Sequence, residues 1–250
     1  MIERIELNAL AIRMRRQYGA DASSPVQIFS QIQGSQDLTL VLFPMGGLFS
    51  GMSFRVGSGG LIAVNSNMSY GRQRLAVAHE LYHIVLDPHC TRTICLQNLD
   101  VGDSQEQNAN VFASFFIAPY EALRSYINED LGAKNQPIGI HEVIRIEQHF
   151  GFSRQGILKR LTDEGMLEPT DADSFRQPDL DQIARLGYDL DLYAASPPER
   201  QYQTLGKYIK LAETLRGSDM ISQGKYEELL LGAFRADIVF GTEGDDPPVD

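Results

Sequence analysis

The sequence has little of three features, and each shortage argues against a class of protein. Only two of the 250 residues are cysteine, Cys90 and Cys95. Their separation of five positions fits no metal-binding pair, so we expect ordinary thiols in a reducing cytoplasm. No apolar run is long enough to cross a bilayer, so we expect no membrane partner. Residues 1–16 are charged throughout, unlike a signal peptide, which also favours a cytoplasmic protein.

Positive charge is the third shortage. The chain has 22 Lys and Arg against 33 Asp and Glu, for a formal net charge of −11. This balance argues against broad, charge-driven binding of nucleic acid, because such binding neutralises phosphates with Lys and Arg. It leaves room for a local basic patch. With 43% hydrophobic residues, the chain has enough apolar material for one substantial core or two small ones.

The most informative segment is residues 72–87, RQRLAVAHELYHIVLD, which contains an HExxH motif. Apolar residues recur at steps of three and four, which predicts a helix ended by the following proline. His79 and His83 share one face of that helix and can bind one metal ion. Glu80 lies beside them, where it can act as the general base toward a metal-activated water.

Two core histidines in a chance pentapeptide are the plain alternative. Glu80 is, however, the only residue with a formal charge between Ala76 and Leu86. A helix this apolar is expected to be buried, and a buried ionisable trio needs a partner that offsets its desolvation. We therefore favour a metal site.

Residues 105–117, QEQNANVFASFFI, predict a second helix that ends near Pro119. A carboxylate at its start is unremarkable, because the helix dipole favours it there. We prefer to read Glu106 as the third metal ligand, because catalytic zinc takes three protein ligands and keeps one position for water. Asn110 lies one turn later and is the expected hydrogen-bond partner of His79. A solvent-facing Asn110 is the alternative.

The segments 72–83 (RQRLAVAHELYH) and 106–119 (EQNANVFASFFIAP) together resemble the ImmA/IrrE family of bacterial metallopeptidases. Members of that family carry an R-x-R-F-x-x-A-H-E-x-x-H helix and an E-x-x-A-N-x-F-A-x-x-x-L-x-P helix; here Leu75 replaces the frequent Phe and Ile117 replaces Leu. The second helix is also similar to the E-x-x-S-D helix of thermolysin-like gluzincins. The resemblance implies a zinc endopeptidase that cleaves a repressor of the Xre helix-turn-helix type and so releases mobile-element or stress genes.

We expect an α+β fold that is mainly helical, with a small antiparallel sheet beside the metal helix and a helical C-terminal half. Strands are predicted at 38–45, 53–56 and 61–65, the last two around the hairpin signal Gly57-Ser58-Gly59-Gly60. Residues 61–65 are predicted to lie at a sheet edge, where Ile62 and Val64 would pair with an extended substrate. A strand with only a packing role is the alternative.

The chain divides into four predicted regions. Residues 1–136 form the metallopeptidase domain, with a polar loop at 89–104, and residues 137–168 form a helical subdomain. Residues 169–240 form a further helical region, with helices expected at 198–216 and 219–240 that pack as a hairpin and offer an accessory or dimer surface. Residues 241–250 form an acidic disordered tail.

The predicted subdomain has the pattern of a helix-turn-helix. Two helical segments, 140–150 and 153–164, flank Gly151, and Ser153 is a natural N-cap. Three cations, Arg154, Lys159 and Arg160, are expected on the surface of the second helix. They are too few on an acidic chain to favour DNA binding, so packing on the protease core or docking of a partner is preferred.

Two rival functions stay open. One is a regulator that binds DNA through residues 140–164 and keeps a structural metal. The other is an antitoxin-like protein whose helical C-terminal half binds a partner. An intact Glu80 argues against both, because a structural site needs no general base. For the peptidase, the oxyanion donor stays open among Tyr70, Tyr82, His89 and Tyr120.

Overall fold

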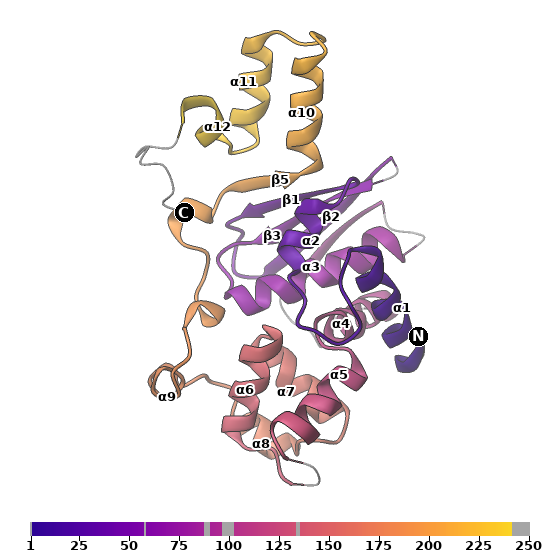
Figure 1. Ribbon diagram of the computed structural model, residues 1–250, viewed down its shortest axis with the longest axis vertical. Helices are drawn as coiled ribbons and strands as arrows, with labels where there is room; N and C mark the ends of the chain where they lie inside the picture. The colour runs from indigo at the N-terminus through magenta and orange to yellow at the C-terminus, as the bar shows by residue number, and fades with distance from the viewer. Residues whose placement is uncertain (1, 58, 88–90, 97–102, 134–135, 242–250) are drawn as a thin grey trace.

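The computed structural model describes residues 2–57, 59–87, 91–96, 103–133 and 136–241 (Figure 1). The fold is α+β, as predicted, and is mainly helical. The predicted acidic tail beyond Gly241, the candidate donor His89 and the thiol of Cys90 lie outside the described residues. Within the described ranges, no helix combines the length and apolarity needed to span a bilayer.

A five-stranded sheet forms the centre of the molecule. Its order is β4-β2-β3-β1-β5. The strands are β1 (Leu38–Phe43), β2 (Phe49–Val56), β3 (Gly59–Asn65), β4 (Arg92–Leu96) and β5 (Gln203–Gly206). The predicted β2–β3 hairpin is confirmed, with Val56 opposite Gly59.

The sheet is mixed, so the prediction of a purely antiparallel sheet is wrong at one pairing. β1 runs parallel to β3, and the other pairs are antiparallel. The chain reverses direction between β1 and β2 and again between β2 and β3. β3, which lies beside β1, therefore runs in the same direction as β1. Strand order depends on contacts far apart in the chain, which local pattern does not reveal.

The predicted substrate role of Ile62 and Val64 is also wrong. β3 lies between β1 and β2, so its backbone groups on both sides are engaged in the sheet. Both side chains are fully buried in the hydrophobic core. The strand has the packing role that was the alternative. The strand at that edge is β4, which lies in the segment 89–104 predicted as a loop.

Three helices stack below the sheet in Figure 1. The helix α3 (Tyr70–Val85) packs on the sheet against β2 and β3, α4 (Ser104–Ile117) packs against α3, and α1 (Arg4–Gln17) packs against α4. Every residue of α3 from Gln73 to Ile84 is buried, as its apolar composition predicted. The remaining short helices before residue 200 are α2 (Ile28–Gly34), α5 (Tyr120–Ser125), a π-helical turn (Tyr126–Asp130), α8 (Pro169–Ser174), α9 (Leu180–Arg185) and two 3-10 turns (Asp191–Tyr193 and Pro198–Arg200).

The predicted helix-turn-helix pair is present as α6 (Ile140–Phe150) and α7 (Arg154–Asp163). Gly151 adopts φ 68° between them, and the Ser153 hydroxyl accepts the N–H of Gly156 as an N-cap. One hydrophobic core runs from Leu7 to Leu167 and includes both helices. The pair therefore packs into the same core as α3 and α4.

Two of the three predicted surface cations are buried, which corrects that prediction. Arg154 is 5% and Arg160 2% exposed. Arg154 forms a bidentate pair with Glu147, with Nε–Oε1 and Nη2–Oε2 distances of 2.5 and 2.9 Å. Arg160 pairs with Glu164 and lies 3.9 Å from the ring centroid of Phe115. Both side chains pack in the core and are not accessible to nucleic acid.

The C-terminal helices form a hairpin above the sheet in Figure 1, with a small core of its own. They are α10 (Lys207–Gly217), α11 (Gln223–Gly232) and α12 (Ala236–Phe240). The helix predicted from 198 starts only at Lys207, because residues 203–206 pair with β1 as a strand. The helix predicted at 219–240 is interrupted near Phe234, which adopts φ 58°.

Candidate metal centre

The centre is built on the buried face of α3. His79 and His83 lie one turn apart, and their Nε2 atoms are 3.2 Å from each other. Arg74, one turn earlier, anchors the helix: its guanidinium donates to the carbonyls of Val26, Phe150 and Gly151 at 2.5, 3.2 and 3.0 Å. This buried cation ties the first arginine-rich turn of the motif to the α6–α7 turn, a role that sequence pattern did not reveal.

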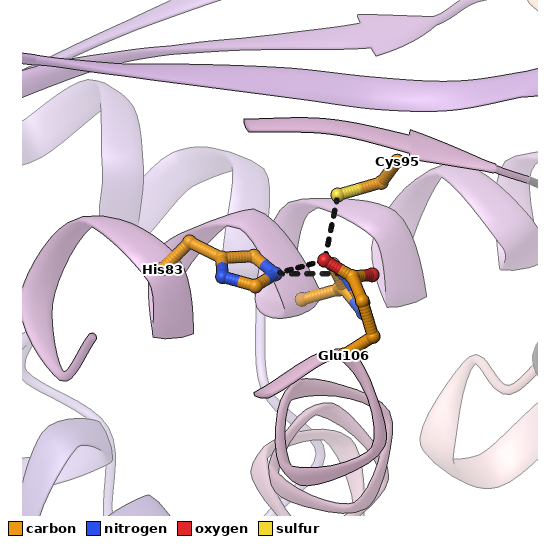
Figure 2. Close-up of side chains that lie close together, drawn as sticks. His83, Cys95 and Glu106 are labelled. Atoms are coloured by element: carbon orange, nitrogen blue, oxygen red, sulfur yellow. Dashed lines mark hydrogen bonds and ion pairs between the residues drawn. The ribbon is translucent and has the colours of Figure 1, made fainter. Parts of the chain in front are cut away.

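The helix α4 brings a carboxylate to the two imidazoles. Asp103 caps α4 by accepting the N–H groups of Gln105 and Glu106, which fixes the first turn. Glu106 Oε2 lies 3.2 Å from His79 Nε2, and its Oε1 lies 3.2 Å from His83 Nε2. Figure 2 shows Glu106 rising from α4 toward the ring of His83. The three predicted ligands therefore meet at one point.

A second polar group orients each histidine. His79 Nδ1 lies 2.8 Å from Asn110 Oδ1, the contact expected for Asn110. With Nδ1 donating to the amide oxygen, Nε2 keeps its lone pair for a metal. His83 Nδ1 lies 3.5 Å from Asp87 Oδ2. The sequence pattern places Asp87 only at the end of the helix. Its position four residues after His83 is the signal that could have identified it as the partner of His83.

These distances suit a tetrahedral metal site. The two Nε2 atoms are 3.2 Å apart, and each lies 3.2 Å from a different carboxylate oxygen of Glu106. Ligand atoms at ordinary zinc distances are separated by about 3.3 Å at the corners of a tetrahedron. Burial alone would raise the pKa of Glu106, but hydrogen bonds and charge from His79 and His83 lower it well below its usual value. The carboxylate is thus kept ionised, as a ligand must be.

Glu80 is the most deeply buried acid of the centre. It is 0% exposed, and neither carboxylate oxygen has a hydrogen-bond partner of good geometry among the described residues. Burial raises its pKa, while His79, Cys95 and Ser53 act in the opposite direction. Gly51 permits the close approach of β2, because a Cβ there would lie 3.0 Å from Glu80 Oε1. A buried carboxylate without a partner is costly, which is typical of a functional group.

Sequence reasoning missed Cys95. This buried residue comes from β4, and its Sγ lies 3.9 Å from Glu106 Oε1. The candidate ligand atoms of His79, His83, Cys95 and Glu106 all lie within 4.8 Å of one another. Figure 2 shows the thiol pointing from its strand toward Glu106. Nothing in the spacing of the two cysteines marked this position; only recognition of β4 as a strand would have brought the thiol to the site.

The structure does not select an oxyanion donor among the candidates it describes. The Tyr82 hydroxyl donates to Gln105 Oε1 at 2.8 Å, although its ring contacts His83. The Tyr120 hydroxyl accepts from Arg124 at 2.8 Å. The Tyr70 ring stacks on Phe29 with the centroids 5.3 Å apart. A groove beside His79 is lined by Arg72, Ser50 and Gln155, among others.

Comparison with known proteins supports the same reading of the site. Residues 39–162 match the Peptidase_M78 family model, described as the IrrE N-terminal-like domain. No curated protein sequence matches the chain. The matched range includes α3, β4 and α4, and with them every residue of the centre. The chain therefore contains an IrrE N-terminal-like domain of the Peptidase_M78 family, in agreement with the predicted resemblance to ImmA/IrrE metallopeptidases.

Proposed function

We propose that the protein is a zinc-dependent endopeptidase that cleaves a helix-turn-helix regulatory protein of the Xre type and so releases mobile-element or stress genes. The observation that carries the proposal is Glu80, an unpartnered, fully buried acid beside a His₂Glu donor set. A metal site that only stabilised the fold would gain nothing from such a group. The match to the IrrE N-terminal-like domain supports the reaction class.

His79, His83 and Glu106 would hold the ion. Their ligand atoms already converge, and Asn110 and Asp87 hold the imidazoles in the required orientation. When bound, zinc supplies a Lewis acid that polarises the scissile carbonyl and lowers the pKa of a water molecule toward neutrality. The protein contributes orientation and a site shielded from bulk solvent.

Glu80 moves the proton. Its carboxylate accepts a proton from the attacking water and then donates it to the nitrogen of the leaving amine. Burial, which raises the pKa of Glu80 above its usual value, suits this second step, because a weakly acidic carboxyl group retains its proton until the amine departs. No other acid of the described centre is so deeply buried.

The β4 strand supports an extended substrate. It lies at one end of the strand order and pairs only with β2 in the described part of the chain. Its side chains Ile94 and Leu96 are 60% and 49% exposed, and Leu96 lines the groove beside His79. A peptide that pairs with the free edge of β4 would gain main-chain hydrogen bonds. β4 thus takes the role predicted for β3.

A helix-turn-helix repressor as the substrate rests on the family resemblance. DNA binding by this chain has less support, because Arg154 and Arg160 are buried in ion pairs rather than displayed on α7. The net charge of −11 argues in the same direction. The C-terminal hairpin offers a surface for the substrate protein or for a second copy of the chain.

Glu80→Gln tests the proposal. Zinc content should be unchanged, because Glu80 is not a ligand, while cleavage of a purified repressor encoded beside this gene should fall by about 10²- to 10⁴-fold, the usual worth of general acid–base catalysis. The measurement is product formation by mass spectrometry. Glu129→Gln, on the π-helical turn away from the centre, is the control and should cleave normally. Wild-type cleavage by Glu80→Gln would remove Glu80 from the mechanism.

A further inference from the structure

The thiol of Cys95 lies beside the point where the three predicted ligands meet. We propose that the Cys95 thiolate is a fourth protein ligand of the metal, which closes the site at rest and must leave before substrate can be cleaved. The inference rests on the proposed metallopeptidase function, since it concerns the same ion. Binding and release of Cys95 would regulate the activity, which a His₂Glu site alone could not do in this way.

Distances support a fourth ligand. Sγ lies 3.9 Å from Glu106 Oε1, and all four candidate ligand atoms lie within 4.8 Å of one another. A sulfur and an oxygen bound to one tetrahedral zinc ion are separated by about 3.6 Å. The Sγ–Oε1 separation is thus within a few tenths of an ångström of that value, and the four-atom group as a whole would contract around a bound ion. Figure 2 shows Sγ facing the carboxylate from the opposite side to α4.

The surroundings of Cys95 do not suit an ordinary core thiol. The side chain is 2% exposed, yet it is not part of either hydrophobic core cluster. It lies instead against two carboxylates, Glu80 and Glu106. Neither carboxylate oxygen of the buried Glu80 has a hydrogen-bond partner of good geometry among the described residues. Two acids and a thiol around two imidazoles are a donor set for a cation, which would offset their mutual repulsion.

An irregularity in the pairing of β2 with β4 orients the Cys95 thiol toward the centre. The register between β2 and β4 shifts between Phe49, opposite Leu96, and Gly51, opposite Cys95. The extra residue, Ser50, makes this an irregularity of the bulge type, which bends a strand and redirects a side chain, often next to an active site. Because β4 pairs only with β2 among the described strands, a substrate strand that pairs with its other edge can draw Cys95 away.

Release is a ligand exchange without redox chemistry. With the ion bound, the Cys95 thiolate would leave it and take a proton from solvent to become a neutral thiol, which would free one position for the reacting groups. No oxidant or co-reactant is required. The resting enzyme would then be a closed four-ligand site, and docking of an extended substrate on β4 would open it.

Cobalt(II) replacement of zinc in the full chain tests the proposal directly. Wild type should show visible ligand-field bands and a near-ultraviolet thiolate-to-cobalt charge-transfer band. Cys95→Ser should lose the near-ultraviolet band and keep the visible bands, which also reports that the variant is folded. Cys90→Ser, which changes the only other thiol in the chain, should keep both.

The outcomes separate this inference from the proposed function. Visible bands without the charge-transfer band in wild type would overturn thiolate ligation and leave the peptidase proposal intact. So would a charge-transfer band that survives in Cys95→Ser. Failure of wild type to bind cobalt or zinc would overturn both. The wild-type spectrum alone can exclude thiolate ligation, so the test does not depend on whether the variant folds.

Zinc affinity and turnover give a second reading. In competition with a chromophoric chelator, Cys95→Ser should bind zinc at least ~10-fold more weakly, since loss of even an outer hydrogen-bond partner costs 10- to 100-fold. Its hydrolysis of fluorescein-labelled casein should rise relative to wild type at saturating zinc. Equal zinc affinity in the two proteins would contradict ligation.

Discussion

The helix α3 and the α10–α11 hairpin place their charged side chains in opposite environments. In α3, Arg74, His79, Glu80 and His83 are all buried, and each lies in a specific polar setting. In the hairpin, pairs such as Lys225–Glu228 lie on the surface, with side chains 49% and 69% exposed. The cost of burying an ionisable group is large, whereas a surface charge costs little. In α3 the buried ionisable groups coincide with the candidate metal centre, whereas the charges of the hairpin lie in solvent.

The Arg154–Glu147 pair offers the largest expected effect on stability. Arg154→Met should destabilise the protein by about 3–5 kcal/mol, because it leaves Glu147 buried without its cation. Tyr193, whose hydroxyl donates to Glu147 Oε2 at 2.7 Å, compensates only in part. Chemical unfolding followed by circular dichroism measures the change.

The pH dependence of that loss is a further sign of a buried acid. Burial raises the pKa of Glu147 in the folded state, while Arg154 lowers it, so removal of Arg154 raises it further. A folded pKa above the unfolded value means that the folded state binds more protons, and stability falls as pH rises through the interval between the two values. The loss in Arg154→Met should thus shrink in acid. A pH-independent loss would contradict the buried-charge account.

Asn110→Ala is expected to act on the metal rather than on the fold. The His79 ring would lose the group that orients it. Zinc affinity should fall by about 10- to 100-fold, the usual effect of removing such a partner. Chelator competition measures the affinity, and Asn67→Ala, in the turn before α3, is the matched control. Unchanged zinc affinity in Asn110→Ala would show that another group orients His79.

Lys225→Ala, in the α10–α11 hairpin, should have the smallest effect on stability. Its ion pair with Glu228 is exposed, so the free energy of unfolding should change by less than about 0.5 kcal/mol. Thermal unfolding by calorimetry is sufficient. A loss as large as that in Arg154→Met would mean that exposure does not govern the worth of charged pairs in this fold.

Helix geometry explains why much of the centre was predictable. A spacing of four residues fixes two side chains on one face wherever the helix lies, so the relation of His79 to His83 and of Glu106 to Asn110 follows from the sequence. The long apolar periodicity of α3 and α4 likewise fixed their existence and burial. These are local properties.

The missed features depend on contacts between distant segments. The five residues of β4 form a strand only because β2 pairs with them, and this pairing brings Cys95 to the centre. The place of β3 inside the sheet depends on β1, so the assignment of Ile62 to a substrate edge was wrong. Arg154 and Arg160 were assigned to the surface by their charge, but their partners allow burial.

Metal content tests the central claim most directly. The claim is that α3 and α4 jointly hold one ion through His79, His83 and Glu106. Purified wild-type protein, loaded with zinc, dialysed and measured by mass spectrometry of the metal, should retain about one ion per chain, the content expected of a catalytic zinc site. Glu106→Ala should retain much less, while Glu121→Ala, at the start of α5, should match wild type. Equal zinc in Glu106→Ala and wild type would contradict the account.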